Sequence, residues 1–174
     1  METIVKTKWN IDIAHSEISF KVKHMMISSV TGRFEDFNAI IESENENFMN
    51  ADMRFSAKVD SISTKNNDRD QHLKSDDFFN AELYPEMTFK SKSFDGSTLI
   101  GDLSIRDITK EISLNTDFNG IAVDPYGQTK AGFEVTGSIN RKDFNLTWNA
   151  VTEAGSIVVS DTIKLIADLQ FIKE

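Results

Sequence analysis

Alternation of apolar and polar residues is the dominant pattern along this chain. Ile18, Phe20 and Val22 alternate with Ser19, Lys21 and Lys23, and the same period of two recurs in five further runs. Successive side chains of a β-strand point to opposite faces, so each run predicts a strand with one apolar and one polar face. The further runs are Met53 to Val59, Leu99 to Ile105, Ile112 to Phe118, Phe133 to Ile139 and Ile163 to Phe171.

Two segments interrupt this period, and short turn signals separate the runs. Residues 66–81 predict a short helix followed by a turn, with Asn67 or Asp68 as the helix N-cap. The second interruption is Met25 to Thr31. Turns are predicted at Asp95-Gly96, at Asn119-Gly120, at Asp124-Pro125-Tyr126-Gly127 and in the polar stretch Glu42 to Asn47. Repeats and flexible linkers are absent, so residues 1–174 are expected to form a single domain.

About eight one-sided strands in a row need a shared dry interior. Sequential hairpins favour an all-β fold, either a closed antiparallel barrel or a two-sheet sandwich, and closure also removes exposed strand edges. The interior of an eight-stranded barrel is either filled by side chains or holds one small ligand. The periodicity does not distinguish between a filled and a ligand-holding interior.

Composition and charge limit the classes of protein to which the chain can belong and the partners it can bind. Apolar residues make up 39% and charged residues 27% of the 174 residues, which excludes both a disordered chain and a membrane-embedded one. The net charge of −9 disfavours nucleic acid. No stretch approaches the ~18 consecutive apolar residues of a membrane span, and no export signal is visible. The chain is therefore expected to be cytoplasmic, or periplasmic if a signal was removed.

Residues that could carry chemistry are few. The three histidines, His15, His24 and His72, could in principle bind zinc, but His15 and His24 lie an odd number of residues apart and would face opposite sides of one strand. Arg69, Asp70 and His72 are expected to fasten the short helix to the barrel. No cysteine and no catalytic or phosphate-binding motif is present. We therefore expect no catalytic residues, no metal site and no cofactor.

Several ordered motifs nevertheless resemble one family. The segment Trp9-Asn10-Ile11-Asp12 is followed by His15-Ser16-Glu17-Ile18-Ser19-Phe20 and then by Gly32-Arg33-Phe34. Further on come Arg69-Asp70-Gln71-His72-Leu73, Asp77-Phe78-Phe79, Tyr84-Pro85-Glu86-Met87-Thr88-Phe89 and Ile139-Asn140-Arg141-Lys142-Asp143-Phe144. In this order and spacing the chain resembles the YceI family from about Lys8 to Lys173. It departs from the family at Arg106-Asp107-Ile108, where many members carry a small, neutral turn.

The resemblance implies a lipocalin-like, eight-stranded antiparallel barrel with a short helix covering part of it, and in many members a homodimer. It also implies an elongated apolar pore for a polyisoprenoid, such as a polyprenyl quinone or alcohol, or another long-chain lipid. The chain would then bind, sequester or transport this lipid without being an enzyme. On the apolar faces of the strands, the expected ligand contacts are Phe20, Val22, Phe55, Val59, Phe89, Leu103, Ile105, Leu114, Phe133, Val135, Leu165 and Ala167.

Two further expectations accompany this assignment. Lys21, Arg54 and Lys164 should point away from the bore, whereas Met25, Met26, Met53 and Met87 could line the mouth or bore, because thioethers fill irregular gaps. The alternative is an interaction or stress-response module whose barrel is filled by its own phenylalanines and binds no ligand.

Overall fold

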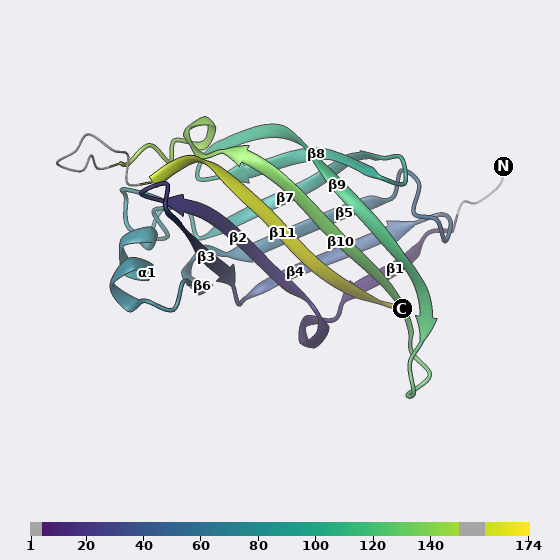
Figure 1. Cartoon of the computed structure of the whole chain (residues 1–174). Coiled ribbons are helices and arrows are strands. Elements are labelled where there is room, and N and C mark those ends of the chain that lie inside the picture. The colour runs from purple at the N-terminus through teal and green to yellow at the C-terminus, as the bar shows by residue number, and fades with distance from the viewer. Residues whose placement is uncertain (1–4, 150–158) are drawn as a thin grey trace.

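The alternating strands close into a ring in the computed structural model, which describes residues 5–149 and 159–174. Neighbouring strands pair antiparallel, and the pairing of β1 with β11 completes the ring (Figure 1). In ring order the strands are β1 (Thr7–Ile11), β4 (Phe37–Ser43), β5 (Asp52–Lys58), β7 (Glu86–Phe94), β8 (Thr98–Ile105), β9 (Ile108–Val123), β10 (Thr129–Asn140) and β11 (Val159–Lys173). The predicted eight-stranded antiparallel barrel is confirmed.

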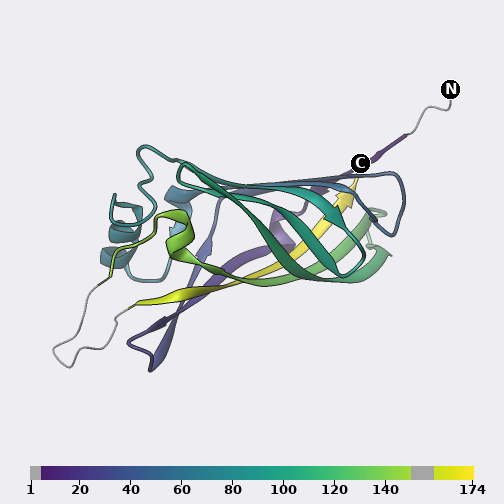
Figure 2. The same cartoon turned by 90° about the horizontal axis from the view of Figure 1, so that it is seen from above.

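Three further strands extend the sheet at one end of the barrel. The long strand β11 pairs with β1 near its C-terminal end, around Phe171, and with β2 (Glu17–His24) along its N-terminal part. Strand β3 (Ser28–Phe34) pairs with β2 and with the two-residue β6 (Ile62–Ser63). The hairpin of β2 and β3 therefore leaves the ring, and it projects from the barrel at the end where the helix lies (Figure 2).

The predicted helix is present but shorter than the segment that predicted it. Helix α1 spans Asn67–Lys74, and its N-cap is Asn66, whose side chain accepts a hydrogen bond from the backbone N–H of Arg69. The predicted cap at Asn67 or Asp68 was wrong by one or two residues. Three short 3₁₀ helices join strands: η1 (Ile13–His15), η2 (Val59–Ser61) and η3 (Arg141–Phe144). No helix in the described part of the chain is long and apolar enough to cross a bilayer.

Two local predictions need correction. Most of the Met25 to Thr31 segment belongs to a strand, because the turn after β2 is tight and β3 already begins at Ser28. Asn119-Gly120 is not a turn but lies inside β9, where Phe118 pairs with Phe133 and Gly120 with Gly132. Asn119 is thus the extra residue of a β-bulge, and the φ of 105° at Gly120 explains the glycine.

Inward-facing side chains of the strands form the core of the barrel. Phe20 on β2 lies directly opposite Gly32 on β3, and its ring occupies the space that a Cβ at Gly32 would need. The glycine therefore lets a large ring lie flat against the sheet. Phe34, two residues further along β3, packs against Phe20 with ring centroids 5.9 Å apart.

Candidate functional site

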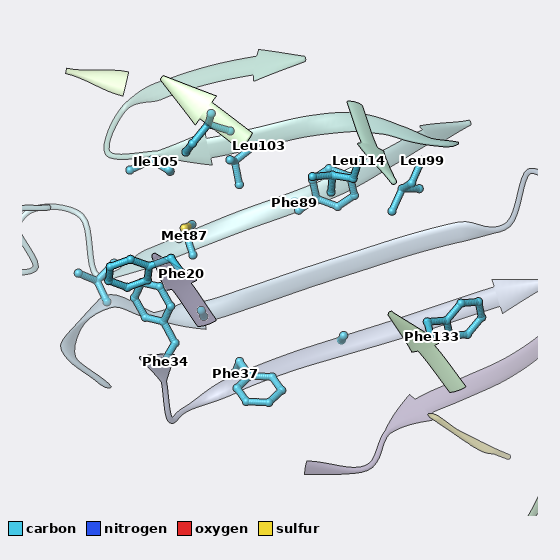
Figure 3. Packing of buried hydrophobic residues seen from close by; sticks show 14 of the residues in the cluster. Phe20, Phe34, Phe37, Met87, Phe89, Leu99, Leu103, Ile105, Leu114 and Phe133 are labelled. Atoms are coloured by element: carbon cyan, nitrogen blue, oxygen red, sulfur yellow. The ribbon is translucent and has the colours of Figure 1, made fainter. Parts of the chain in front are cut away.

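A cavity of about 210 Å³ lies inside the barrel, and its walls are almost entirely apolar. Its lining on β11 includes Ile163 and Phe171, eight residues apart, which corresponds to roughly 27 Å along a strand. Figure 3 shows the same elongation, with Phe20 and Phe34 at one end of the cluster and Phe133 at the other. The cavity is therefore long, dry and shaped for a chain-like molecule.

Eleven of the twelve expected contact residues line this cavity. They are Phe20, Val22, Phe55, Phe89, Leu103, Ile105, Leu114, Phe133, Val135, Leu165 and Ala167. Val59 is the exception: it is buried in η2, after β5 has ended, and does not line the cavity. The alternating pattern assigns faces only within a strand, so it does not apply to Val59, which follows the end of β5. Contact of the eleven with a ligand stays a prediction.

Charged side chains on the same strands point outward, as expected. Lys21 and Lys164 are exposed. Arg54 borders the cavity, but 65% of its side chain is exposed, and its guanidinium lies 3.4 Å from the carboxylate of Asp52. Of the four methionines, Met53 and Met87 line the cavity, whereas Met25 and Met26 lie exposed at the tip of the β2–β3 hairpin. The predicted role of Met25 and Met26 in the cavity was therefore wrong.

Aromatic rings in mostly edge-to-face contact, here called the aromatic floor, close the end of the cavity far from α1. The floor comprises Trp9, Phe48, Phe118, Phe133 and Phe171. Phe48 comes from the loop between β4 and β5, is fully buried, and has its ring centroid 5.1 Å from that of Phe133. It holds a left-handed backbone conformation, with φ of 62°, which a phenylalanine rarely adopts. Burial of its ring offsets this strain, because the loop must fold back to insert it.

The opposite end is bordered by α1 and the residues after it. Leu73 on α1, Phe78, Phe79 and Leu146 line the cavity there. Arg106, in the turn between β8 and β9, donates hydrogen bonds to the backbone oxygens of Asp76 (3.1 Å) and Phe78 (2.9 Å). It adopts φ of 56° to do so. The unusual turn residue thus anchors the segment that follows the helix at this mouth of the cavity.

Arg141 is a buried charge at the same mouth, and the sequence pattern did not identify it as such. Only 1% of the residue is exposed, and it lines the cavity. Its guanidinium donates to the backbone oxygens of Leu146 (2.5 Å), Trp148 (2.7 Å), Ser160 (2.9 Å) and Val159 (3.4 Å). Burial lowers the pKa of Arg141, and the carboxylate of Asp161, 3.7 Å away, partly opposes this shift. Its donors are thus directed to main-chain carbonyls rather than to the cavity.

The motif Arg69, Asp70 and His72 makes structural contacts around α1. Asp70 accepts hydrogen bonds from the backbone N–H (2.8 Å) and the hydroxyl (2.6 Å) of Thr64, and Arg69 donates to the same hydroxyl at 2.7 Å. Thr64 is buried and directly follows β6. His72 lies 2.8 Å from Asp77, and its ring packs edge-on against Trp148. These contacts tie the helix to the end of the sheet.

Replacing Asp70 with alanine is expected to lower the free energy of unfolding by about 1–3 kcal/mol, because it leaves buried Thr64 donors without their acceptor. Urea denaturation of the purified variant measures the change. Asp68→Ala is the matched control, since Asp68 is exposed on the same helix turn and should change stability little. Unchanged stability of the Asp70 variant would contradict the fastening role.

Thr116 is a buried polar residue in the wall of the cavity. It is 3% exposed, lines the cavity on β9, and its hydroxyl has no hydrogen-bond partner among the described residues. Thr116→Val keeps the shape and removes the unpaired hydroxyl, so we expect the free energy of unfolding to stay constant or rise by about 1–2 kcal/mol. Urea denaturation tests this, with exposed Thr136→Val as control. A clear loss of stability would show that the hydroxyl has a partner in solution.

The histidines do not come together. His15 lies 2.8 Å from Asp12, His72 pairs with Asp77, and His24 is exposed at the end of β2. Within residues 5–149 and 159–174, no three His, Asp or Glu side chains form a group that could hold a metal ion.

Comparison with known proteins gives one consistent family. The model of the YceI-like domain matches residues 9–171. A UPF0312 protein of Staphylococcus epidermidis is 36% identical over 166 residues, which cover 95% of this chain and 97% of the relative.

Solved structures with this fold include the YceI protein of Campylobacter jejuni. It is 32% identical, with a TM-score of 0.73 over 87% of this chain and 90% of that chain. A protein from Saccharophagus degradans described as a polyisoprenoid binding domain shares the fold at 14% identity, with a TM-score of 0.70 over 95% of this chain and 98% of that chain. Because the YceI-like model spans nearly the whole barrel, the chain belongs to the YceI-like domain family.

Proposed function

We propose that this protein binds a long apolar lipid, a polyisoprenoid such as a polyprenyl quinone or alcohol, inside the barrel and sequesters or transports it. The observation that carries the proposal is the long cavity with apolar walls between α1 and the aromatic floor. The description of the Saccharophagus degradans domain as polyisoprenoid-binding agrees with it. A barrel filled by its own phenylalanines would leave no such cavity. The cavity therefore argues against the alternative of an interaction module with a filled barrel.

The chemistry of the walls suits an isoprenoid chain. Such a chain offers no hydrogen bonds along its length, so its site needs length and dryness rather than charged groups. Each buried CH₂ group contributes about 0.8 kcal/mol, offset by the cost of ordering the chain. Arg141 already donates to main-chain carbonyls, and Arg54 is mostly exposed and pairs with Asp52, so neither charged residue among the described lining presents an unpaired charge to the cavity.

We also propose that the protein is not an enzyme. Catalytic acids and bases need to converge on a substrate site with matched pKa values. Arg69 and Asp70 instead share Thr64 as a partner, and His72 is held between Asp77 and Trp148. These contacts stabilise the end of the barrel rather than place a reactive group in the cavity.

The first test is the identity of any lipid that copurifies with the protein. Native protein is extracted with organic solvent, and the extract is analysed by mass spectrometry. We expect a long-chain isoprenoid in near-stoichiometric amount. An extract free of long-chain lipid, from protein that also fails to bind added polyprenyl compounds, would remove support for the carrier function.

The second test is the thermal stability of delipidated protein. A ligand that binds only the native state raises the melting temperature by mass action. Delipidated protein should therefore melt earlier and recover when polyprenyl alcohols are added, with longer chains restoring more because they bury more CH₂ groups. A fatty acid series of matched carbon number is the control for the isoprenoid character. A melting temperature that does not depend on chain length in either series would contradict a tunnel.

A further inference from the structure

The turn between β2 and β3 presents three adjacent apolar side chains to solvent. Met25, Met26 and Ile27 are 38%, 64% and 81% exposed, and we call them the apolar tip. Strands β2 and β3 carry the tip away from the barrel, at the end where α1 lies (Figure 2). Large apolar side chains at the end of a projecting hairpin are costly in water unless a partner covers them.

The turn itself does not explain these residues. Met25 and Met26 both have positive φ, 52° and 59°, and the backbone N–H of Ile27 donates to the oxygen of His24 at 3.2 Å. This is the geometry of a type I′ hairpin turn, in which Asn-Gly is strongly favoured and other residues are strained. Two methionines therefore weaken the turn, so the reason for them must lie in what their side chains contact.

The stem of the hairpin, next to the apolar tip, is basic. Lys21 and Lys23 lie on the outer face of β2, and Lys21 lies directly opposite Lys164 of β11. Like charges directly opposite each other are destabilising in a sheet, and no described acidic side chain forms an ion pair with any of these three lysines. We call them the lysine stem. On a chain of net charge −9, this local positive charge is unusual.

Acidic groups near the lysine stem have other neighbours. On the same two strands, Glu17 and Asp168 lie opposite each other at the far end of β2, and Glu17 is within 3.8 Å of Arg33 on β3. Asp161, near the start of β11, lies 3.4 Å from Lys142. The lysine stem therefore lies between the Glu17–Asp168 pair and the apolar tip, whereas Asp161, which lies beside the stem, is paired with Arg141 and Lys142.

The hairpin is also part of the cavity wall. Val22 on β2 and Ile163 on β11 pair directly and both line the cavity, and Val159, which also lines it, pairs with His24 next to the tip. The apolar tip therefore lies within a few residues of the cavity mouth on the same strands.

We propose that the β2–β3 hairpin docks the protein on an anionic lipid bilayer. The apolar tip enters the interface between headgroups and acyl chains, and the lysine stem contacts lipid phosphates, which brings the cavity mouth to the membrane surface. Apolar insertion combined with basic residues is what binds peripheral segments to anionic membranes. A single hairpin tip is too small for the roughly 800 Å² per partner of a stable protein–protein interface, which favours a bilayer. The inference goes beyond the proposed function, because delipidated protein should dock as well.

The test is cosedimentation of the full-length protein with vesicles. One set consists of phosphatidylcholine with about 30% phosphatidylglycerol, and the other of phosphatidylcholine alone. The tip variant Met25→Asn, Met26→Gly, Ile27→Thr supplies the favoured type I′ residues, so its melting temperature should equal or exceed that of the wild type. The stem variant Lys21→Gln, Lys23→Gln, Lys164→Gln removes the charge. The matched control is Val123→Thr, Tyr126→Ser, which removes two exposed apolar side chains (67% and 90% exposed) at the β9–β10 turn.

We expect wild type and control to bind anionic vesicles alike and to bind neutral vesicles more weakly. The tip variant should lose binding about tenfold or more, and the stem variant about fivefold for each lysine removed. Equal binding by tip variant and wild type, or no binding by a folded wild type, would overturn the proposal. Tip-dependent self-association without vesicle binding, seen by analytical ultracentrifugation, would overturn it as well and assign the tip to a second copy. Because vesicle binding is measured without a cavity ligand, failure here leaves the carrier function to its own tests.

Discussion

Replacing Arg141 with alanine is expected to lower the free energy of unfolding by about 3–5 kcal/mol, which is a large part of the total for a domain of this size. The guanidinium is 1% exposed and satisfies the main-chain oxygens of Leu146, Trp148, Val159 and Ser160. Its removal takes this donor from the carbonyls of Leu146, Trp148 and Ser160, while Val159 keeps the Asn149 amide as a donor, and it opens a void at the mouth of the cavity. Urea denaturation followed by circular dichroism measures the loss.

Two further variants separate the causes of this effect. Arg141→Met fills most of the volume but donates nothing, so it should restore only the part of the loss that comes from packing. Lys142→Ala, next in sequence with 50% of its side chain exposed, should change stability by less than about 0.5 kcal/mol. Wild-type stability in both Arg141 variants would mean that the carbonyls find other donors, and the structural role would be wrong.

Replacing Ala167 with phenylalanine should abolish lipid binding while leaving the fold intact. Ala167 lines the cavity and pairs with Val135 on β10 and Ile18 on β2, both of which also line it. A phenylalanine at this position projects into the cavity and occupies the space of the chain. In a filled core the same change would cost typically 1–3 kcal/mol or more, because the added ring forces overpacking.

Affinity and stability must be measured on the same delipidated protein. We expect the Ala167→Phe variant to bind a polyprenyl alcohol at least about tenfold more weakly, with a ligand-free melting temperature close to that of the wild type. Thr136→Phe is the control, because Thr136 is exposed on β10 and adds the same ring outside the barrel. Severe destabilisation by Ala167→Phe together with unchanged affinity would favour a filled barrel.

Alternation along the chain predicted a large part of the wall of the cavity, on the strands where it was found, but not the part formed by β4. A period of two assigns each side chain of a regular strand to one face. It therefore identified Phe20, Leu114 and Leu165 as inward residues without any knowledge of pairing. The helix could also be located, because residues 66–81 break the period and begin with polar residues suited to an N-cap.

The same reasoning fails where strands bend or end. Val59 continues the alternation but lies in a 3₁₀ helix, and Asn119-Gly120 has turn composition but forms a bulge within a long strand. Both depend on which residues of a distant strand lie opposite, and a local pattern carries no information on that register.

The structure at each end of the cavity was decided by tertiary contacts alone. Phe48 follows a polar stretch that predicts an ordinary surface loop, yet its ring inserts into the aromatic floor because the barrel leaves space there. Arginine is usually a surface residue, but Arg141 is buried because carbonyls of two separate segments surround it. Single-strand periodicity thus determined which faces are dry, whereas contacts between residues far apart in sequence decided that the dry interior is closed at one end and hollow.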